Sequence, residues 1–169
     1  YTTARAMKYG WMWKTPLQHR NGCGYVFDSD YITPKQAQQE VEELFGHSID
    51  VRKVINFEAG RYENFWVNNC IAVGLSSSFI EPLESTSIFL SIASLETLRH
   101  FLDTIETQDQ SEIDVFNEIV GNNMNEVLYF IYLHYITKRN DTDFWRTFRE
   151  KYPPPNGLVD RLKKIENNN

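Results

Sequence analysis

Residues 84–87 place one carboxylate and three hydroxyl side chains where an apolar helix is expected to begin. They are Glu84, Ser85, Thr86 and Ser87. Backbone N–H groups at a helix start have no partner inside the helix and carry partial positive charge, so they stabilise a nearby anion. The pattern therefore allows an anion or phosphate site. N-capping by these hydroxyls is its commoner, purely structural alternative.

Glu81 and Glu84 are two carboxylates on either side of Pro82. At the helix start, the dipole and the N–H donors favour the ionised form of Glu84, which suits it to accept a proton or to stabilise a cation. Glu81 precedes a proline and is pushed toward extended backbone, so the two carboxylates need not face the same way. Taken alone, the spacing favours capping over catalysis for both.

Serine and histidine chemistry has weaker support in the sequence. Residues 74–78, Gly-Leu-Ser-Ser-Ser, are similar to the G-x-S-x-G turn of serine hydrolases but lack its second glycine, which disfavours a nucleophilic serine. The histidines are His19, His47, His100 and His134. They show no pair at metal-ligand spacing, so no metal site is expected, and the last of them should pack in the core or cap a helix.

Trp11 and Trp13 are alternate residues of an expected strand. Alternate strand residues project to the same side, so the two rings should form an aromatic wall. Packing in the core is the simpler interpretation of such a wall. A position beside a flat ligand is the alternative.

Composition and charge exclude several classes of protein. The chain has 169 residues, of which 41% are hydrophobic and 14% aromatic, so it is not a disordered chain. A net charge of -6 with scattered basic residues argues against binding to nucleic acid or to an anionic membrane.

There is no signal-peptide core or membrane-length apolar run, so a cytoplasmic protein is expected. Cys23 and Cys70 should be free, buried thiols.

The sequence pattern predicts strands and turns in residues 1–83 and helices in residues 84–169. We therefore expect an α+β fold in one incomplete domain. The first part should contain a hairpin at residues 9–17 and 25–27, a strand pair at 54–57 and 62–67, and a buried strand at 70–73. Because only two asparagines separate residues 62–67 from 70–73, these two strands are expected to be one bent strand.

Helices are expected at residues 84–105, 113–137 and 141–152, followed by a proline break and a short amphipathic tail. The first part should also contain one helix, at residues 35–45. Thr33 is its expected N-cap, Pro34 occupies its first turn and Gly46 ends it.

Four segments together resemble the flavin-dependent tryptophan halogenases. Residues 10–16, "GWMWKTP", are similar to the family's W-x-W-x-I-P motif, with Thr15 in place of isoleucine. Residues 24–37, "GYVFDSDYITPKQA", resemble the strand and helix that follow it. Residues 68–87, "NNCIAVGLSSSFIEPLESTS", resemble the second signature, which usually ends in S-T-G, and "HYITKRNDTDFW" at residues 134–145 is also similar. The segments keep the family's order over nearly the whole chain.

This resemblance implies a partial flavin monooxygenase-like fold of the FAD/NAD(P)-binding class. A family enzyme receives reduced FAD from a separate flavin reductase and, with oxygen, oxidises bound chloride or bromide to hypohalous acid. The oxidant travels through an internal tunnel to an aromatic small molecule of the tryptophan or indole class.

The resemblance also implies roles for single residues. Glu84 matches the family's catalytic glutamate beside the substrate, where a carboxylate stabilises the cationic ring intermediate and assists its deprotonation. Thr86 and Ser87 would offer backbone N–H groups to the halide, with Ser87 in place of the usual glycine. Ser85 would lie between the flavin and substrate regions.

The remaining matched residues are apolar. Leu75 and Ile88 would line the flavin. Trp13 would contact the flavin and Trp11 would lie near the substrate, so that the two rings separate flavin from substrate.

The chain departs from the family pattern in three ways. It contains no G-x-G-x-x-G dinucleotide loop, none of its lysines matches the catalytic lysine, and it stops before the aromatic cluster that holds tryptophan in family members. We therefore expect an internal fragment that is inactive alone and whose exposed apolar faces favour self-association. A flavin-dependent hydroxylase of the same fold and a non-catalytic interaction module are the alternatives.

Overall fold

The computed structural model describes residues 1–167, which form an α+β structure that divides into two compact units. The first unit combines residues 1–57 with the chain from residue 135 onward, and the second comprises Glu58–His134. Each unit has a hydrophobic cluster of its own. Helices of the second half of the chain contribute to both units.

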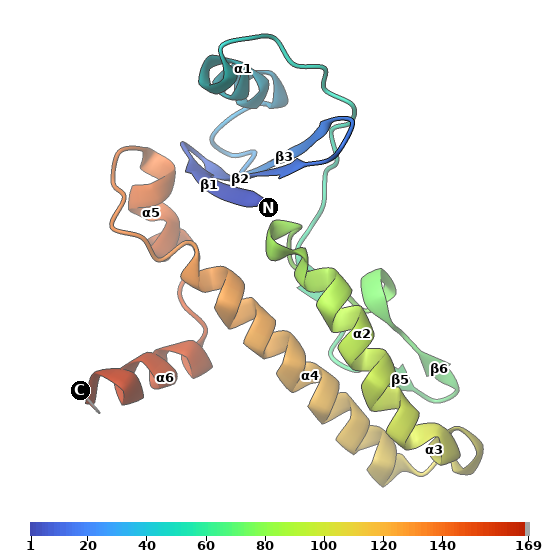
Figure 1. Ribbon diagram of the computed structural model, residues 1–169. Coiled ribbons are helices and arrows are strands. Elements are labelled where there is room, and N and C mark those ends of the chain that lie inside the picture. Colours follow the sequence, from blue (N-terminus) through green and yellow to red (C-terminus); the bar gives the residue numbers. More distant parts are fainter. Residues whose placement is uncertain (168–169) are drawn as a thin grey trace. The chain divides into compact units, whose positions relative to one another are not determined.

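A three-stranded antiparallel sheet forms the start of the first unit (Figure 1). Its strands are β1 (Thr3–Met7), β2 (Gly10–Pro16) and β3 (Asn21–Phe27). The predicted hairpin is confirmed as β2 and β3, in a register that pairs Trp13 with Gly24. β1, which was not predicted, pairs with β2 and places Ala6 opposite Trp11.

Helix α1 (Pro34–Phe45) is confirmed with both of its predicted ends. The Thr33 hydroxyl accepts a hydrogen bond from the Gln36 N–H, and the Gln36 side chain accepts one from the Thr33 N–H, so the two residues form a capping box. Gly46 ends the helix at φ 73°. The helix covers one face of the sheet, where Val41 packs with Met7 and Met12.

Helices α5 (Asp143–Lys151) and α6 (Asn156–Asn167) complete the first unit. The α5 aromatic side chains Phe144 and Trp145 are buried. The Lys151 ammonium group lies 3.0 Å from the Asp28 carboxylate and 2.6 Å from that of Asp30, so it ties the end of α5 to the loop after β3. The hydrogen bond to Asp30, more than any other contact, raises the pKa of Lys151.

Short strand pairs begin the second unit. β4 (Gly60–Arg61) pairs with β7 (Ser78–Phe79), and β5 (Trp66–Val67) pairs with β6 (Cys70–Ile71). The expected strand at residues 54–57 is wrong, since residues 51–59 form no regular element. The expected bent strand is also wrong: Asn68, at φ 52°, reverses the chain, so the segments on either side pair as a hairpin.

Helices form the rest of the second unit. They are α2 (Thr86–Leu98), α3 (Leu102–Thr107) and α4 (Gln110–Leu133), and α2 packs beside α4 (Figure 1). The expected single helix at residues 84–105 is interrupted by the 3-10 turn η3 (Arg99–Phe101), because Phe101 leaves helical geometry at φ -118°. His134 caps α4, with its Nδ1 2.9 Å from the Phe130 carbonyl.

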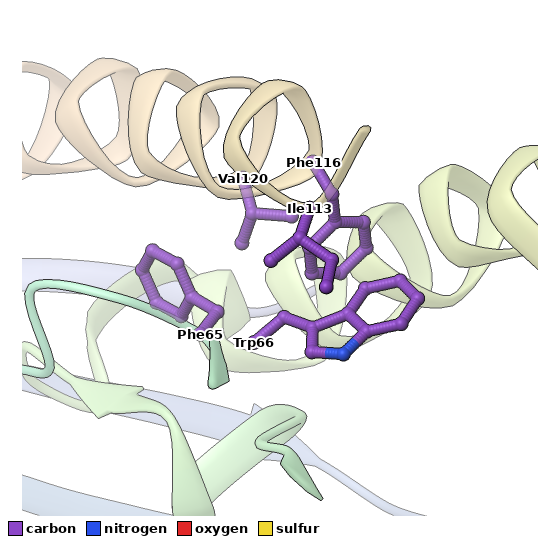
Figure 2. Close-up of a cluster of buried hydrophobic side chains, with 5 residues drawn as sticks. All are labelled: Phe65, Trp66, Ile113, Phe116 and Val120. Carbon is purple, nitrogen blue, oxygen red and sulfur yellow. The ribbon is translucent and has the colours of Figure 1, made fainter. Parts of the chain in front are cut away.

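Phe65 and Trp66, just before and at the start of β5, pack against α4 to form the core of the second unit. Figure 2 shows Phe65 and Trp66 facing Ile113, Phe116 and Val120 of the helix. The Trp66 and Phe116 rings meet edge to face, with centroids 5.4 Å apart. This contact joins a segment of little regular structure to the longest helix.

Asn117 supplies the polar link in this region. Its Oδ1 accepts hydrogen bonds from the Phe65 and Trp66 N–H groups, both at 2.8 Å, and its Nδ2 donates to the Trp66 carbonyl at 2.9 Å. We expect Asn117→Ala to lower the free energy of unfolding by about 2 kcal/mol, because it leaves part-buried backbone groups without partners. Urea denaturation measures this loss. Asn122→Ala, at an exposed position of the same helix, is the control, and an equal effect of both changes would contradict the prediction.

Two further expectations concern the cysteines and membrane-spanning helices. Cys23 and Cys70 are free, as predicted, but both are exposed rather than buried. Within residues 1–167, no helix combines the length and the apolar character needed to cross a membrane.

Candidate functional site

The 3-10 turn η1 (Gly74–Ser76) packs against α2, with Gly74 beside Ser91. Gly74 has φ 66°, and a Cβ atom at this position would lie 3.0 Å from the Ser91 hydroxyl oxygen. Glycine therefore permits both the backbone geometry and the close approach to the helix. The Ser76 and Ser77 hydroxyls donate to the carbonyls of Val73 and Gly74, so they stabilise this turn, which argues against a nucleophilic role.

Glu84 and Ser85 have unusual backbone conformations. Both lie in the 3-10 turn η2 (Leu83–Ser85), Glu84 at φ 59° and Ser85 at φ 55°. Left-handed geometry at a residue with a side chain costs about 1 kcal/mol or more, and such residues cluster at functional sites. Glu84 therefore lies just before α2, which begins at Thr86, and the left-handed pair sets the direction of the Glu84 side chain.

The structure separates the two glutamates of this loop. Glu81 is buried, with 9% of its surface exposed, whereas Glu84 is exposed. Of the two carboxylates, only that of Glu84 is thus available in this unit to meet a ligand from solvent.

Thr86 and Ser87 are the first two residues of α2, a helix of 13 residues. Ser85 is the N-cap residue, but its side chain makes no capping hydrogen bond, so the capping interpretation of this hydroxyl is wrong. Thr86 is buried and its hydroxyl lies 3.5 Å from the Leu83 carbonyl, on the preceding turn. The N–H groups at this helix start, together with the helix dipole, are suited to a small anion.

Leu75 and Ile88 are large apolar side chains beside this helix start. Leu75 on η1 is 73% exposed and Ile88 in the first turns of α2 is 64% exposed. η1 packs on α2, the helix that carries both Ile88 and Thr86. Leu75 and Ile88 thus present exposed apolar surface on η1 and α2, the kind of surface that a flat ring system requires.

Trp11 and Trp13 belong to the first unit. They alternate on β2 with Met12, which packs against α1, so both rings project from the opposite face of the sheet, as predicted. Trp13 lies over Gly24, and Trp11 meets Trp145 of α5 edge to face at 6.3 Å. Both are only partly buried, so they pack without being enclosed.

Gly24 is the residue on which the Trp13 ring depends. A Cβ atom at Gly24 would lie 2.0 Å from the Trp13 ring, which cannot stay in place against it. We expect Gly24→Ala to displace this ring and to lower the free energy of unfolding by about 1 to 3 kcal/mol. Near-ultraviolet circular dichroism and urea denaturation measure the two effects. The control is Gly22→Ala on the same strand, where the nearest atom would be 3.6 Å away; similar spectra and stabilities for both variants would contradict the prediction.

No role was expected for Arg139 or Trp145 individually. In the structure, Arg139 and Trp145 hydrogen-bond to backbone carbonyls of β1, more than 130 residues earlier in the chain. The only sequence signal for them was the similarity of the whole segment to a family motif. No local pattern identifies a contact between such distant residues.

Comparison with known proteins supports the resemblance over the whole chain. The family model "Tryptophan halogenase" matches residues 1–169. The chain is 38% identical over 165 residues to a "7-chloro-L-tryptophan 6-halogenase" of Kutzneria sp. (strain 744), a match that covers 96% of this chain and 32% of the relative. The chain thus spans about a third of the length of such relatives.

Solved structures agree with the sequence comparison. A flavin-dependent halogenase from Brevundimonas sp. BAL3 is similar with a TM-score of 0.83 and 40% identity, over 96% of this chain and 33% of that one. A tryptophan 6-halogenase from Streptomyces toxytricini is similar with a TM-score of 0.84 and 37% identity, over 97% of this chain and 32% of that one.

Proposed function

The chain belongs to the tryptophan halogenase family, and from this premise we propose that it carries the catalytic carboxylate and the halide site of a flavin-dependent halogenase. Its substrate would be an aromatic small molecule of the tryptophan or indole class. The cofactor would be FAD, supplied in reduced form by a separate flavin reductase, within a flavin monooxygenase-like fold. The names of the relatives and the α+β structure support this proposal.

Glu84 is the proposed catalytic carboxylate. Attack of an electrophilic halogen on an aromatic ring creates positive charge on the ring and then requires loss of a proton. The exposed Glu84 carboxylate would stabilise that charge and accept the proton. Its left-handed backbone, held next to the start of α2, is the single observation that carries this assignment, because strain at such a position requires a compensating use.

Thr86 and Ser87 are the proposed halide ligands, through their backbone N–H groups. Chloride and bromide are small anions that suit a helix start whose N-cap side chain does not compete for these donors. Ser87 stands where the family usually has glycine, but a Ser side chain at this position leaves the backbone N–H in place. Ser85, exposed and adjacent, would lie between the flavin and the substrate.

The residues present fit a flavin at the apolar surface beside this helix start. Gly74, with no side chain, lets η1 lie close to α2, and the exposed Leu75 and Ile88 would contact the ring system. By the family resemblance, Trp13 would contact the flavin, and Trp11 would lie near the substrate. When bound in reduced form with oxygen, FAD would supply the oxidation of halide to hypohalous acid; the two tryptophan rings would keep substrate and flavin apart.

A halide exchange in a coupled assay tests the proposal. The intact protein is mixed with a flavin reductase, FAD, oxygen and either tryptophan or indole, in chloride or in bromide, and the products are identified by mass spectrometry. We expect chlorinated product in the first salt and brominated product in the second. A hydroxylated product that is the same in both salts would identify a flavin-dependent hydroxylase instead, and no product in either salt would favour an interaction module.

The exposed apolar side chains of α2 predict self-association of the 169-residue polypeptide. Phe89, Ile92 and Leu95 are all more than half exposed, as is Ile88. Sedimentation velocity should show association that increases with concentration. Ile92→Glu should shift the protein toward the monomer, whereas His100→Glu, which adds charge at an exposed polar position, should not. A wild-type monomer at all concentrations would contradict this prediction.

A further inference from the structure

Side chains from the segment 134–145 bind backbone carbonyls at the end of β1 and in the turn that leads to β2, the strand that carries Trp11. Arg139 Nη1 donates to the Ala6 carbonyl at 2.8 Å and to the Met7 carbonyl at 2.9 Å. Trp145 Nε1 also donates to the Met7 carbonyl, at 2.8 Å. The Thr142 hydroxyl donates to the carbonyl of Lys8 at 2.7 Å, so three consecutive carbonyls of β1 and its turn are bound from this one segment.

Arg139 is itself fixed in place. Its Nε and Nη2 donate to the two oxygens of Asp141, at 2.9 Å and 2.7 Å, in a bidentate pair. These hydrogen bonds lower the pKa of Asp141 and raise that of Arg139. The Arg139 guanidinium also lies over the Trp145 ring, 5.0 Å from its centroid. The guanidinium therefore uses its planar fork, its remaining donor and its flat face at the same time, which a lysine ammonium cannot do.

The strand residue that Arg139 binds and the ring that its guanidinium covers both lie next to Trp11. Ala6, whose carbonyl Arg139 binds, is the residue directly opposite Trp11 in the β1–β2 register. Trp145, whose ring lies under the guanidinium, meets the Trp11 ring edge to face at 6.3 Å and 87°. Trp145 is 3% exposed, so its ring has little freedom to move, whereas Trp11 is only partly buried.

Trp11 consequently receives its orientation from two directions. The backbone contact fixes the strand beside it, and the Trp145 ring supports its side chain. Gly10, next to Trp11, allows a close approach to β3, because a Cβ atom there would lie 2.1 Å from the Val26 carbonyl oxygen. A small change at Arg139 therefore acts on Trp11 through contacts at both the main chain and the ring.

We propose that Arg139, held by Asp141, is a positioning residue that sets the orientation of Trp11 through the carbonyls of β1 and the ring of Trp145. This inference rests on the proposed function, in which Trp11 helps to separate substrate from flavin. It assigns a role to the segment "HYITKRNDTDFW": the segment does not contact the reacting atoms but fixes the aromatic wall. Loss of that orientation would let the oxidant escape without halogenating the ring.

Fluorine NMR of the intact protein labelled with 5-fluorotryptophan tests the proposal without turnover. The Trp11 resonance is identified as the one lost in Trp11→Phe. In Arg139→Lys we expect this resonance to shift or broaden while that of Trp66, in the other unit, stays unchanged. Arg146→Lys is the matched control, since Arg146 binds Asp143 and the Asn140 carbonyl and no strand.

Activity supplies the second measurement. The halogenated product formed per reduced FAD consumed should fall about 10-fold in Arg139→Lys, because small misplacements in a reaction site have effects of up to about 100-fold. Asp141→Asn, which leaves Arg139 in place but removes its charged partner, should act in the same direction and replaces Arg139→Lys if that variant does not fold.

The outcomes separate the two proposals. A Trp11 resonance that is unchanged in the folded variants, even with a lower melting temperature, would show that Arg139 is merely structural and would overturn the inference. A wild-type protein with no halogenating activity would overturn the proposed function, but the shift of the Trp11 resonance would still decide the positioning role.

Discussion

Glu84→Gln should remove most of the halogenating activity of the intact protein, by about 100-fold to 10,000-fold, while the protein stays folded. Glutamine keeps the size and the hydrogen-bonding reach of the side chain but has no negative charge and cannot accept the ring proton. Because Glu84 is exposed and outside α2, the change should leave the melting temperature almost unaltered. The measurement is the initial rate of halogenated product with saturating reduced FAD and halide.

Glu96→Gln is the matched control for this prediction. Glu96 is an exposed carboxylate on the same helix, 3.4 Å from the Arg99 guanidinium, and it belongs to no proposed site. Its substitution should leave the rate unchanged. An unchanged rate in Glu84→Gln as well would refute the catalytic role and favour a structural one, since the left-handed turn would then serve only to start the helix.

The 169-residue polypeptide by itself should form no halogenated product in the same coupled assay. The surfaces proposed for the flavin are open in this chain: Leu75 and Ile88 are largely exposed, so little of a bound ring would be shielded from water. Hypohalous acid formed there would diffuse away rather than reach a substrate. The chain also contains no G-x-G-x-x-G loop, and it spans about 32% of a family member.

Adding the polypeptide to reductase, FAD, halide and tryptophan, with a blank that lacks the polypeptide, measures this prediction. The intact protein under the same conditions is the positive control. Halogenated product above the blank would contradict the prediction and would show that residues 1–169 suffice for flavin binding and halide oxidation.

Local elements followed from local patterns. Helix α1 was predictable because Thr33, Pro34 and Gly46 act through neighbours within one turn. The β2–β3 hairpin and the common face of Trp11 and Trp13 followed from alternation along one strand. The strand expected at residues 54–57 was wrong because an apolar run there found no partner strand, and pairing is a property of two segments.

The sequence by itself determined the family, most helices, the first hairpin and the identity of the candidate site residues. Only the tertiary structure decided that Glu84 and Ser85 are left-handed, that η1 packs on α2, and that Arg139 binds the carbonyls beside Trp11. The physical reason is the distance along the chain over which each feature is set. Caps and strand alternation depend on residues a few positions apart. A strained turn, or hydrogen bonds between residues more than 130 positions apart, is stable only where packing supplies the partners.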